Sequence, residues 1–85
     1  MGYRVEILRS AARELKHLPQ PMRRRVMRAI HALANDPRPP GAKLLTGPER
    51  FWRVRVGDYR VVYRITDELV EVLVLRVRHR SDAYR

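Results

Sequence analysis

Residues 51–63 carry the signature of a β-hairpin, and they read Phe51-Trp52-Arg53-Val54-Arg55-Val56-Gly57-Asp58-Tyr59-Arg60-Val61-Val62-Tyr63. Apolar residues take alternate positions on both sides of Gly57-Asp58, which is the pattern of two strands that bury one face. A two-residue hairpin loop needs a positive φ, and Gly57 adopts one without steric strain. A loop of this length sets the pairing of the strands, so Arg55 is expected opposite Arg60.

The predicted pairing divides the hairpin into an apolar face and a basic face. The apolar face is expected to pack against helices and comprises Trp52, Val54, Val56, Tyr59, Val61, Tyr63 and Ile65. The other face gathers Arg53, Arg55, Arg60 and Arg64. Like charges that oppose each other across a hairpin are unfavourable, so this face predicts an external anion and suits a phosphate cradle. The alternative is a basic face that is simply solvated.

Two short helices are predicted before the hairpin. Residues 3–8 alternate like a strand, and Ser10 is expected to cap the first helix. Apolar residues then recur at helical spacing in two stripes, Ala11, Leu15 and Leu18, then Met22, Val26, Ala29, Ile30 and Leu33. Pro19-Gln20-Pro21 separates the helices, with Pro21 expected to begin the second, which stops at Asn35-Asp36-Pro37. So tight a break predicts an antiparallel helical hairpin, followed by a loop over residues 36–49.

The order of these elements predicts an α+β fold. Three strands are expected over residues 51–56, 59–66 and 70–77, so the order is strand, helix, helix and three strands. The compact solution is a single domain, residues 1–85, in which the helical hairpin packs on one face of a mostly antiparallel sheet. The last strand is apolar on both faces and is expected in a central, covered position.

The register of the last strand depends on the turn near residues 66–69. A two-residue loop would pair Arg64 with Glu71 and turn Arg76 toward the core. A three-residue loop would place Arg76, Arg78 and Arg80 beside Arg60 and would turn Leu73, Leu75 and Val77 into the core. We expect the second register.

The charge balance indicates a polyanionic partner. Nineteen basic residues against nine acidic ones give a net charge of +10, and seventeen of the basic residues are arginine. Such a chain attracts nucleic acid or an acidic protein, and the planar fork of arginine suits phosphate oxygens. The absence of cysteine excludes disulfides, thiolate metal sites and a cysteine nucleophile, and it fits a cytoplasmic location. The longest apolar run is too short to span a bilayer, so no membrane partner is expected.

No metal site or cofactor is predicted. His17, His31 and His79 are scattered, and the acidic residues are spread too thinly for two-metal nuclease chemistry. The sequence has no glycine-rich phosphate loop. The basic run Arg23-Arg24-Arg25 on the second helix is interpreted as a solvated face rather than as a second RNA contact.

Several stretches of the sequence match one known protein family. They are the hairpin quoted above, residues 15–19, Leu33-Ala34-Asn35-Asp36-Pro37-Arg38, residues 43–47 and Val77-Arg78-His79-Arg80-Ser81-Asp82-Ala83-Tyr84. On these residues the chain resembles the RelE family of bacterial type II toxins, along essentially its whole length. The resemblance implies the RelE fold and a metal-independent endoribonuclease that cleaves mRNA, in many members in the ribosomal A site, and so inhibits translation. It also implies a cognate antitoxin, which for a +10 chain is expected to be acidic.

The resemblance also implies roles for individual residues. Arg53 and Arg55 match a basic pair near the scissile phosphate, while Arg60 and Arg80 match arginines that stabilise it in the transition state. Tyr84 matches a tyrosine that orients the reacting 2′-hydroxyl or assists proton transfer. Contacts with RNA are expected from Arg53, Arg55, Arg60, Arg64, Arg78 and His79.

The candidate proton-transfer groups depart from the family pattern. The basic pair is Arg53 and Arg55 where lysine is common, and a guanidinium holds its proton too tightly to be a good acid or base. His79 could take that role, or it could be an ordinary surface histidine.

Two other functions stay open from the sequence. ParE-type relatives share the fold but inhibit DNA gyrase by binding it, without cutting RNA. A non-catalytic RNA-binding module would keep the basic face and tolerate the loss of Tyr84. The set of Arg60, Arg80 and Tyr84 favours the nuclease, because a protein that only binds gyrase has no need of it.

Overall fold

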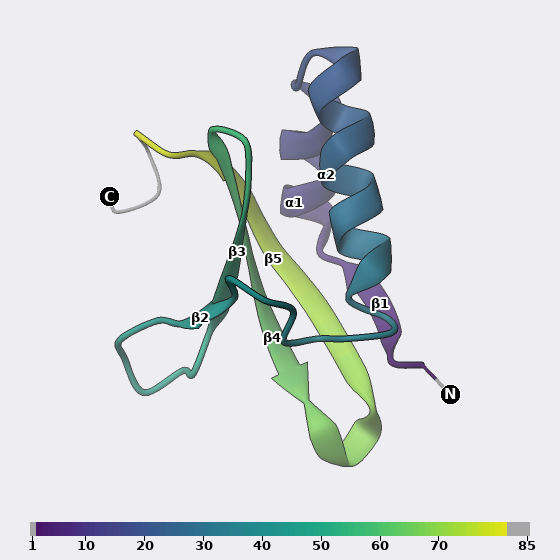
Figure 1. Ribbon diagram of the computed structural model, residues 1–85, viewed down its shortest axis with the longest axis vertical. Coiled ribbons are helices and arrows are strands. Elements are labelled where there is room, and N and C mark those ends of the chain that lie inside the picture. Colours follow the sequence, from purple (N-terminus) through teal and green to yellow (C-terminus); the bar gives the residue numbers. More distant parts are fainter. Residues whose placement is uncertain (1, 82–85) are drawn as a thin grey trace.

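The computed structural model describes residues 2–81 and arranges two helices on one face of a twisted sheet (Figure 1). The elements follow in the order β1 (Arg4–Ile7), α1 (Arg9–Lys16), α2 (Gln20–Ala32), β2 (Lys43–Leu44), β3 (Trp52–Val56), β4 (Tyr59–Thr66), the 3₁₀ helix η1 (Asp67–Leu69) and β5 (Glu71–His79). Within this part of the chain the strands lie in the order β1-β5-β4-β3-β2, with β1 parallel to β5 and the other pairs antiparallel. The predicted α+β fold is confirmed.

The core lies between the helices and the sheet, and it confirms both apolar stripes. The helical segment contributes the buried residues Ala11, Leu15, Leu18, Val26, Ile30 and Leu33, and the sheet contributes Val56, Val61, Tyr63, Val72, Val74 and Val77. Burying one Val, Leu or Ile side chain contributes about 1.5–3 kcal/mol relative to leaving it exposed. Packing of the helices therefore buries one face of the sheet and stabilises the fold. In residues 2–81 no helix lies against the other face (Figure 1).

The central hairpin has the predicted register. Arg55 lies opposite Arg60 and Val56 lies opposite Tyr59. Gly57 has a φ of 59°, and a β-carbon at this position would come within 3.0 Å of the Met22 side chain on α2. The tip of the hairpin therefore needs glycine both for its backbone angle and for its close approach to the helix.

The helix boundaries differ from the sequence prediction at two points. α1 begins at Arg9 with Leu8 as its N-cap, so the prediction of Ser10 as the cap was wrong. The N–H of Leu8 still pairs with the carbonyl of Val74 in β5, so the chain turns directly from the sheet into the helix. α2 begins at Gln20, because Pro19 holds the extended conformation before the helix and Pro21 falls at its second position.

The register of β5 matches neither of the two loops considered from the sequence. Thr66 pairs with Glu71 around a four-residue turn, in which Val70 has a φ of 54°. Arg64 therefore opposes Leu73, and Val72 and Val74 rather than Leu73 and Leu75 enter the core. A bulge at Leu75 then reverses the alternation, because Tyr63 pairs with Val74 while Val62 pairs with Arg76.

After the bulge, the side chains in the second half of β5 lie on the predicted sides of the sheet. Arg78 lies opposite Arg60 and Arg76 opposite Val62, so both are on the basic face as predicted, and Val77 is buried in the core. The four-residue turn and the bulge each shift the pairing of β5 with β4. Their combined effect leaves Arg76 and Arg78 on the predicted face.

Candidate nucleic-acid interface

Three arginines of the hairpin lie on the sheet face away from the helices. Arg55 opposes Arg60 across β3 and β4, and Arg53 opposes Val62 two residues away. Arg53 and Arg60 are buried, with 6% and 8% of their surface exposed, whereas Arg55 is exposed. The basic face is thus not a solvated one throughout, since two of its guanidinium-bearing side chains are packed into the sheet surface. Packing of this kind restricts the directions in which a charged group can point.

One cavity of about 140 Å³ opens at the tip of the hairpin. Its lining consists of Arg55, Gly57, Asp58, Tyr59, Arg60 and Arg80. The end of β5 is tied to the tip, because the N–H of Arg80 donates to the carbonyl of Asp58 over 2.7 Å. The Arg80 guanidinium also lies 4.0 Å from the Asp58 carboxylate, with both side chains about two-thirds exposed. An exposed ion pair of this kind is weak, so Arg80 can turn toward another anion.

A second cavity of about 300 Å³ lies beside the first, toward β2. Its lining consists of Pro40, Gly41, Lys43, Arg53, Val54 and Arg55. Arg55 lines both cavities. Lys43 lies directly opposite Arg53 in the β2–β3 pair, so a second pair of like charges opposes across the sheet. Lys43 was not among the site residues expected from the sequence, because β2 is two residues long and shows no alternation.

Arg78 is engaged by an acidic residue of α1. Its Nε donates to Glu14 Oε2 over 2.7 Å, and the backbone N–H of Val77 donates to Glu14 Oε1 over 2.8 Å. β1 ends at Ile7, so Glu14 covers the edge of β5 that β1 leaves open. Nothing in the sequence pointed to this contact except that Glu14 is the one acidic residue of α1.

His79 and Arg64 lie away from the two cavities. His79 packs edge-to-face against Tyr59, with ring centroids 5.3 Å apart, and its Nδ1 lies 2.9 Å from the Ser81 hydroxyl. It therefore shares a side of the sheet with Tyr59 rather than with Arg60. Arg64 is at the far end of β4, where it lines a different cavity with Arg38, Glu49, Arg50, Trp52, Ile65, Asp67 and Glu68. Tyr84 lies outside the described residues.

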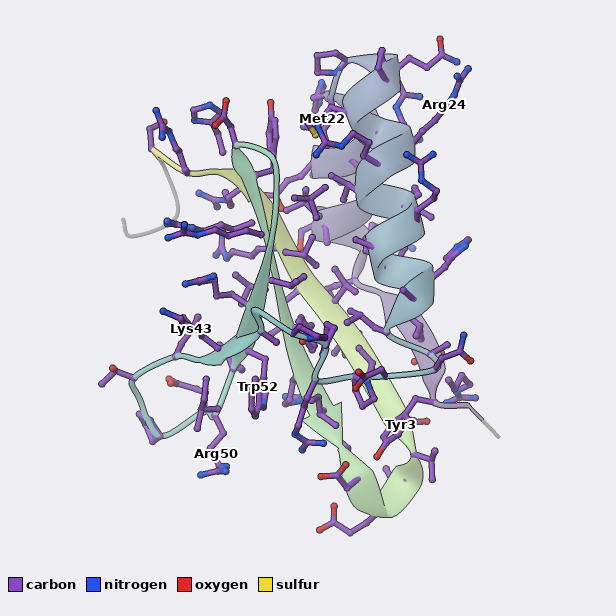
Figure 2. All side chains as sticks on the ribbon, viewed as in Figure 1. Tyr3, Met22, Arg24, Lys43, Arg50 and Trp52 are labelled. Carbon is purple, nitrogen blue, oxygen red and sulfur yellow. The ribbon has the colours of Figure 1, made fainter. Side chains whose placement is uncertain are left out.

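A polar cluster of Tyr3, Arg38 and Asp67 lies at that far end of the sheet (Tyr3 is labelled in Figure 2). Arg38 donates to both carboxylate oxygens of Asp67, over 3.3 and 2.9 Å, and the Tyr3 hydroxyl donates to the same carboxylate over 2.7 Å. These hydrogen bonds, from Arg38 first and Tyr3 second, lower the pKa of Asp67 below its ordinary value. The Arg38 guanidinium also lies 5.2 Å from the centre of the Trp52 ring.

The described part of the chain holds neither a candidate metal cluster nor a candidate membrane-spanning helix. Residues 2–81 contain no group of three His, Cys, Asp or Glu side chains that could hold a metal ion. No helix among them is long and apolar enough to cross a membrane. Basic side chains line both cavities: Arg55, Arg60 and Arg80 at the hairpin tip, and Lys43, Arg53 and Arg55 toward β2.

The sequence matches one family profile along nearly its whole length. Residues 5–84 match the family described as the ParE toxin of type II toxin-antitoxin system, parDE. Two toxins of Mycobacterium tuberculosis are similar to the chain. RelG is 37% identical, with 100% of this chain and 99% of the toxin covered, and RelE is 36% identical, with 98% and 87% covered.

Solved structures show the same fold. The archaeal RelE–RelB complex from Pyrococcus horikoshii contains a chain that superposes with a TM-score of 0.85 at 30% identity, over 98% of this chain and 100% of that one. The RelBE2 toxin–antitoxin complex from Mycobacterium tuberculosis gives a TM-score of 0.82 at 32% identity, over 93% and 99%.

Proposed function

The chain belongs to the RelE/ParE family of type II toxin–antitoxin toxins, and from that premise we propose that it is a metal-independent endoribonuclease that cleaves mRNA in the ribosomal A site and thereby inhibits translation. The observation that carries the proposal is the arginine-lined cavity at the hairpin tip, where Arg55, Arg60 and Arg80 converge. Packing of the Arg60 side chain into the sheet supports the proposal, because a charge held in place before the substrate binds can stabilise the charge that develops in the transition state.

The proposed reaction uses the 2′-hydroxyl of the RNA as its nucleophile. The 2′-oxygen forms a bond to the neighbouring phosphorus as it loses its proton, and the bond to the 5′-oxygen of the next nucleotide breaks as that oxygen gains a proton. Negative charge builds on the phosphoryl oxygens in between. Arg55, Arg60 and Arg80 stabilise that charge, and preorganised donors of this kind typically contribute about 10²–10³ each to the rate.

Proton transfer in this scheme falls to a group other than the arginines. A guanidinium does not release its proton at physiological pH, so Arg53 and Arg55 act through charge alone. We assign the orientation of the 2′-hydroxyl, or its deprotonation, to Tyr84 on the strength of the family resemblance. His79 is a weaker candidate, because its ring packs against Tyr59 instead of lining the cavity.

The proposed partner in the cell is an acidic antitoxin that covers the arginine face. The net charge of +10 supports this proposal, and so do the structural relatives, which were solved as RelE–RelB toxin–antitoxin complexes. An acidic segment laid beside Arg53, Arg55 and Arg60 would exclude RNA by occupying the same charges.

Controlled expression of the toxin tests the proposed function. We expect translation to stop, and 5′-end mapping should show discrete cuts in mRNA. The matched control is the same induction with the antitoxin co-expressed, which should prevent both effects. Growth arrest with intact mRNA and double-strand breaks in DNA would instead indicate the gyrase-directed function of ParE-type relatives.

A further inference from the structure

We propose that Lys43, Arg53 and Arg55 form a second phosphate subsite, which holds the RNA phosphate next to the one that reacts at Arg55, Arg60 and Arg80. The inference rests on the proposed function and extends it, because it gives the RNA strand a path along β3, from the hairpin tip toward β2. It also moves Arg53 from the reacting phosphate to its neighbour.

The two cavities support this division. The cavity at the hairpin tip is lined by Arg60 and Arg80, the cavity near β2 is lined by Lys43 and Arg53, and Arg55 belongs to both. Arg53 does not line the cavity at the tip. Two neighbouring anions that share one arginine fit this arrangement better than a single phosphate does.

Burial and charge show that the second cavity suits an anion. Arg53 is 6% exposed, and its Nε is buried without a hydrogen-bond partner among residues 2–81. Lys43 opposes it directly across the β2–β3 pair, and the residues that line this cavity include no acid. A buried arginine that faces a lysine is electrostatically unfavourable unless an anion lies between or beside them.

The spacing of two arginines on β3 fits neighbouring phosphates of one strand, and Arg55, which this cavity shares with the proposed reacting site, makes RNA the occupant we propose. Arg53 and Arg55 are two residues apart on one face of β3, which corresponds to about 6.6 Å along the strand. Neighbouring phosphates in an extended single strand repeat at a similar distance. A basic groove that follows the backbone is the usual device for binding single strands.

The subsite predicts a division of labour between binding and chemistry. Lys43 and Arg53 contact a phosphate that does not react, so they stabilise the bound substrate and the transition state alike. Their loss should raise KM more than it lowers kcat, whereas loss of Arg60 or Arg80 should act mainly on kcat.

The test is equilibrium binding of a short fluorescent RNA, built on a mapped cleavage site and made uncleavable by 2′-deoxy substitution at the reacting position. Lys43→Gln and Arg53→Gln should each weaken binding about tenfold and reduce the slope of log Kd against log salt by about 0.7. The matched control is Arg24→Gln, which removes the same charge from α2 on the far side of the molecule from Lys43 (Figure 2). The control should change neither quantity appreciably.

A second set of RNAs locates the phosphate. Each carries one neutral methylphosphonate next to the reacting position, on one side or the other. At one of the two positions, neutralisation should weaken binding by the wild-type protein and should then abolish the further effect of Lys43→Gln and Arg53→Gln. Arg53→Lys, which keeps the charge, should keep the salt slope, and thermal unfolding of all variants checks that Arg53 substitutions leave the fold intact.

The outcomes separate this inference from the proposed function. If the wild-type protein neither binds the RNA nor cuts mRNA, the proposed function is wrong. If it does both, but the Lys43 and Arg53 variants match Arg24→Gln, the subsite is wrong and the function stands. If those variants bind RNA normally but lose affinity for the antitoxin, the cavity holds an acidic protein segment, and the RNA subsite is overturned.

Discussion

Two arginines on the open face of the sheet, Arg53 and Arg60, are nearly as buried as the core. Removing a guanidinium from water is unfavourable unless hydrogen bonds or an anion compensate for the lost hydration. In exchange, a packed side chain keeps its direction before the ligand arrives, so binding requires little further ordering. At the scale of single residues, the fold therefore preorganises positive charge rather than merely displaying it.

Replacing Arg60 or Arg80 by alanine should reduce mRNA cleavage by about 10²–10³, because each removes a charged donor from the cavity at the hairpin tip. Single-turnover cleavage on programmed ribosomes measures the effect. Both variants should still bind antitoxin, with Arg60→Ala binding it more weakly, because the proposed acidic segment lies beside Arg60. Arg80 is exposed and its loss should leave stability unchanged, but Arg60 is buried, so Arg60→Ala also loses packing and needs a thermal-unfolding control. Full toxicity of both soluble variants would contradict the nuclease assignment.

Replacing Tyr63 by phenylalanine should destabilise the protein by about 0.5–1.5 kcal/mol. The buried hydroxyl of Tyr63 donates to the carbonyl of Pro37 over 2.7 Å, and burial raises the pKa of Tyr63 to about 12, so the donor stays protonated at physiological pH. Urea unfolding measures the change. Tyr3→Phe is the control, since it removes an exposed hydroxyl and should have a smaller effect. If the two substitutions reduced the free energy of unfolding equally, burial of the Tyr63–Pro37 hydrogen bond would not increase its contribution to stability.

At the scale of elements, the end of β5 is held by contacts from three directions. β4 pairs with it, the hairpin tip bonds to Arg80, and Glu14 of α1 bonds to Val77 and Arg78 along the edge that β1 leaves open. The bulge at Leu75 bends the strand just before these contacts begin. The position of Arg80 at the cavity thus depends on a helix from the other face of the sheet.

Removing the Glu14 carboxylate should loosen this end of the sheet. Glu14→Ala leaves the Val77 N–H and Arg78 without the partner they have in the structure, and it should destabilise the protein by about 1–3 kcal/mol. Glu14→Gln can still accept from the Val77 N–H and should lose less. Urea unfolding and hydrogen exchange at Val77 measure the two variants, and equal losses would mean that the ion pair rather than the backbone bond matters.

The sequence was sufficient where structure depends on neighbours in the chain. The register of Arg55 against Arg60 follows from a two-residue turn, and the apolar stripes of both helices follow from their spacing. The register of β5 did not follow, because the four-residue turn and the bulge at Leu75 each change the alternation and only tertiary contacts choose between such combinations. The same limit applies to Glu14, whose partners Val77 and Arg78 are distant in sequence, and to Lys43, whose two-residue strand has no alternation that would reveal its pairing with Arg53.

Asp67, in the turn before β5, should make the free energy of unfolding depend on pH. Because the pKa of Asp67 is lowered in the folded state by Arg38 and Tyr3, its contribution is fully present above the pKa of an unfolded aspartate and is lost as the pH falls through the folded value. Asp67→Asn should therefore be less stable than wild type near neutral pH, and the difference should shrink in acid. Urea unfolding across a pH series measures this, and a constant difference would rule out the linkage.

At the scale of the whole molecule, basic residues outnumber acidic ones by about two to one. Nineteen basic residues outnumber nine acidic ones, and within residues 2–81 no three potential metal ligands gather. The net charge therefore predicts attraction for a polyanion, while under the proposed function cleavage would depend on the arginines of the cavity at the hairpin tip.

Cleavage should persist when divalent ions are removed. Ribosomes need Mg²⁺, so the measurement is made on free RNA at high toxin concentration or on a complex formed before the chelator is added. EDTA should leave the single-turnover rate unchanged, since the arginines supply the charge stabilisation that a metal would otherwise provide. Loss of cleavage in EDTA, with recovery upon addition of one particular divalent ion, would contradict the proposed mechanism.

The central position of β5 in the sheet has a consequence for the order in which the protein is synthesised and folds. β5 lies between β1 and β4, yet it follows both of them in the chain, so the sheet lacks its middle until residues 71–79 have been synthesised. The pairing of β1 with β5 joins segments more than sixty residues apart, and contacts of such long range form late. The end of β5 also brings Arg80 to the cavity. During synthesis, the sheet therefore cannot be completed, and Arg80 cannot reach the cavity, until β5 has emerged and paired with β1 and β4.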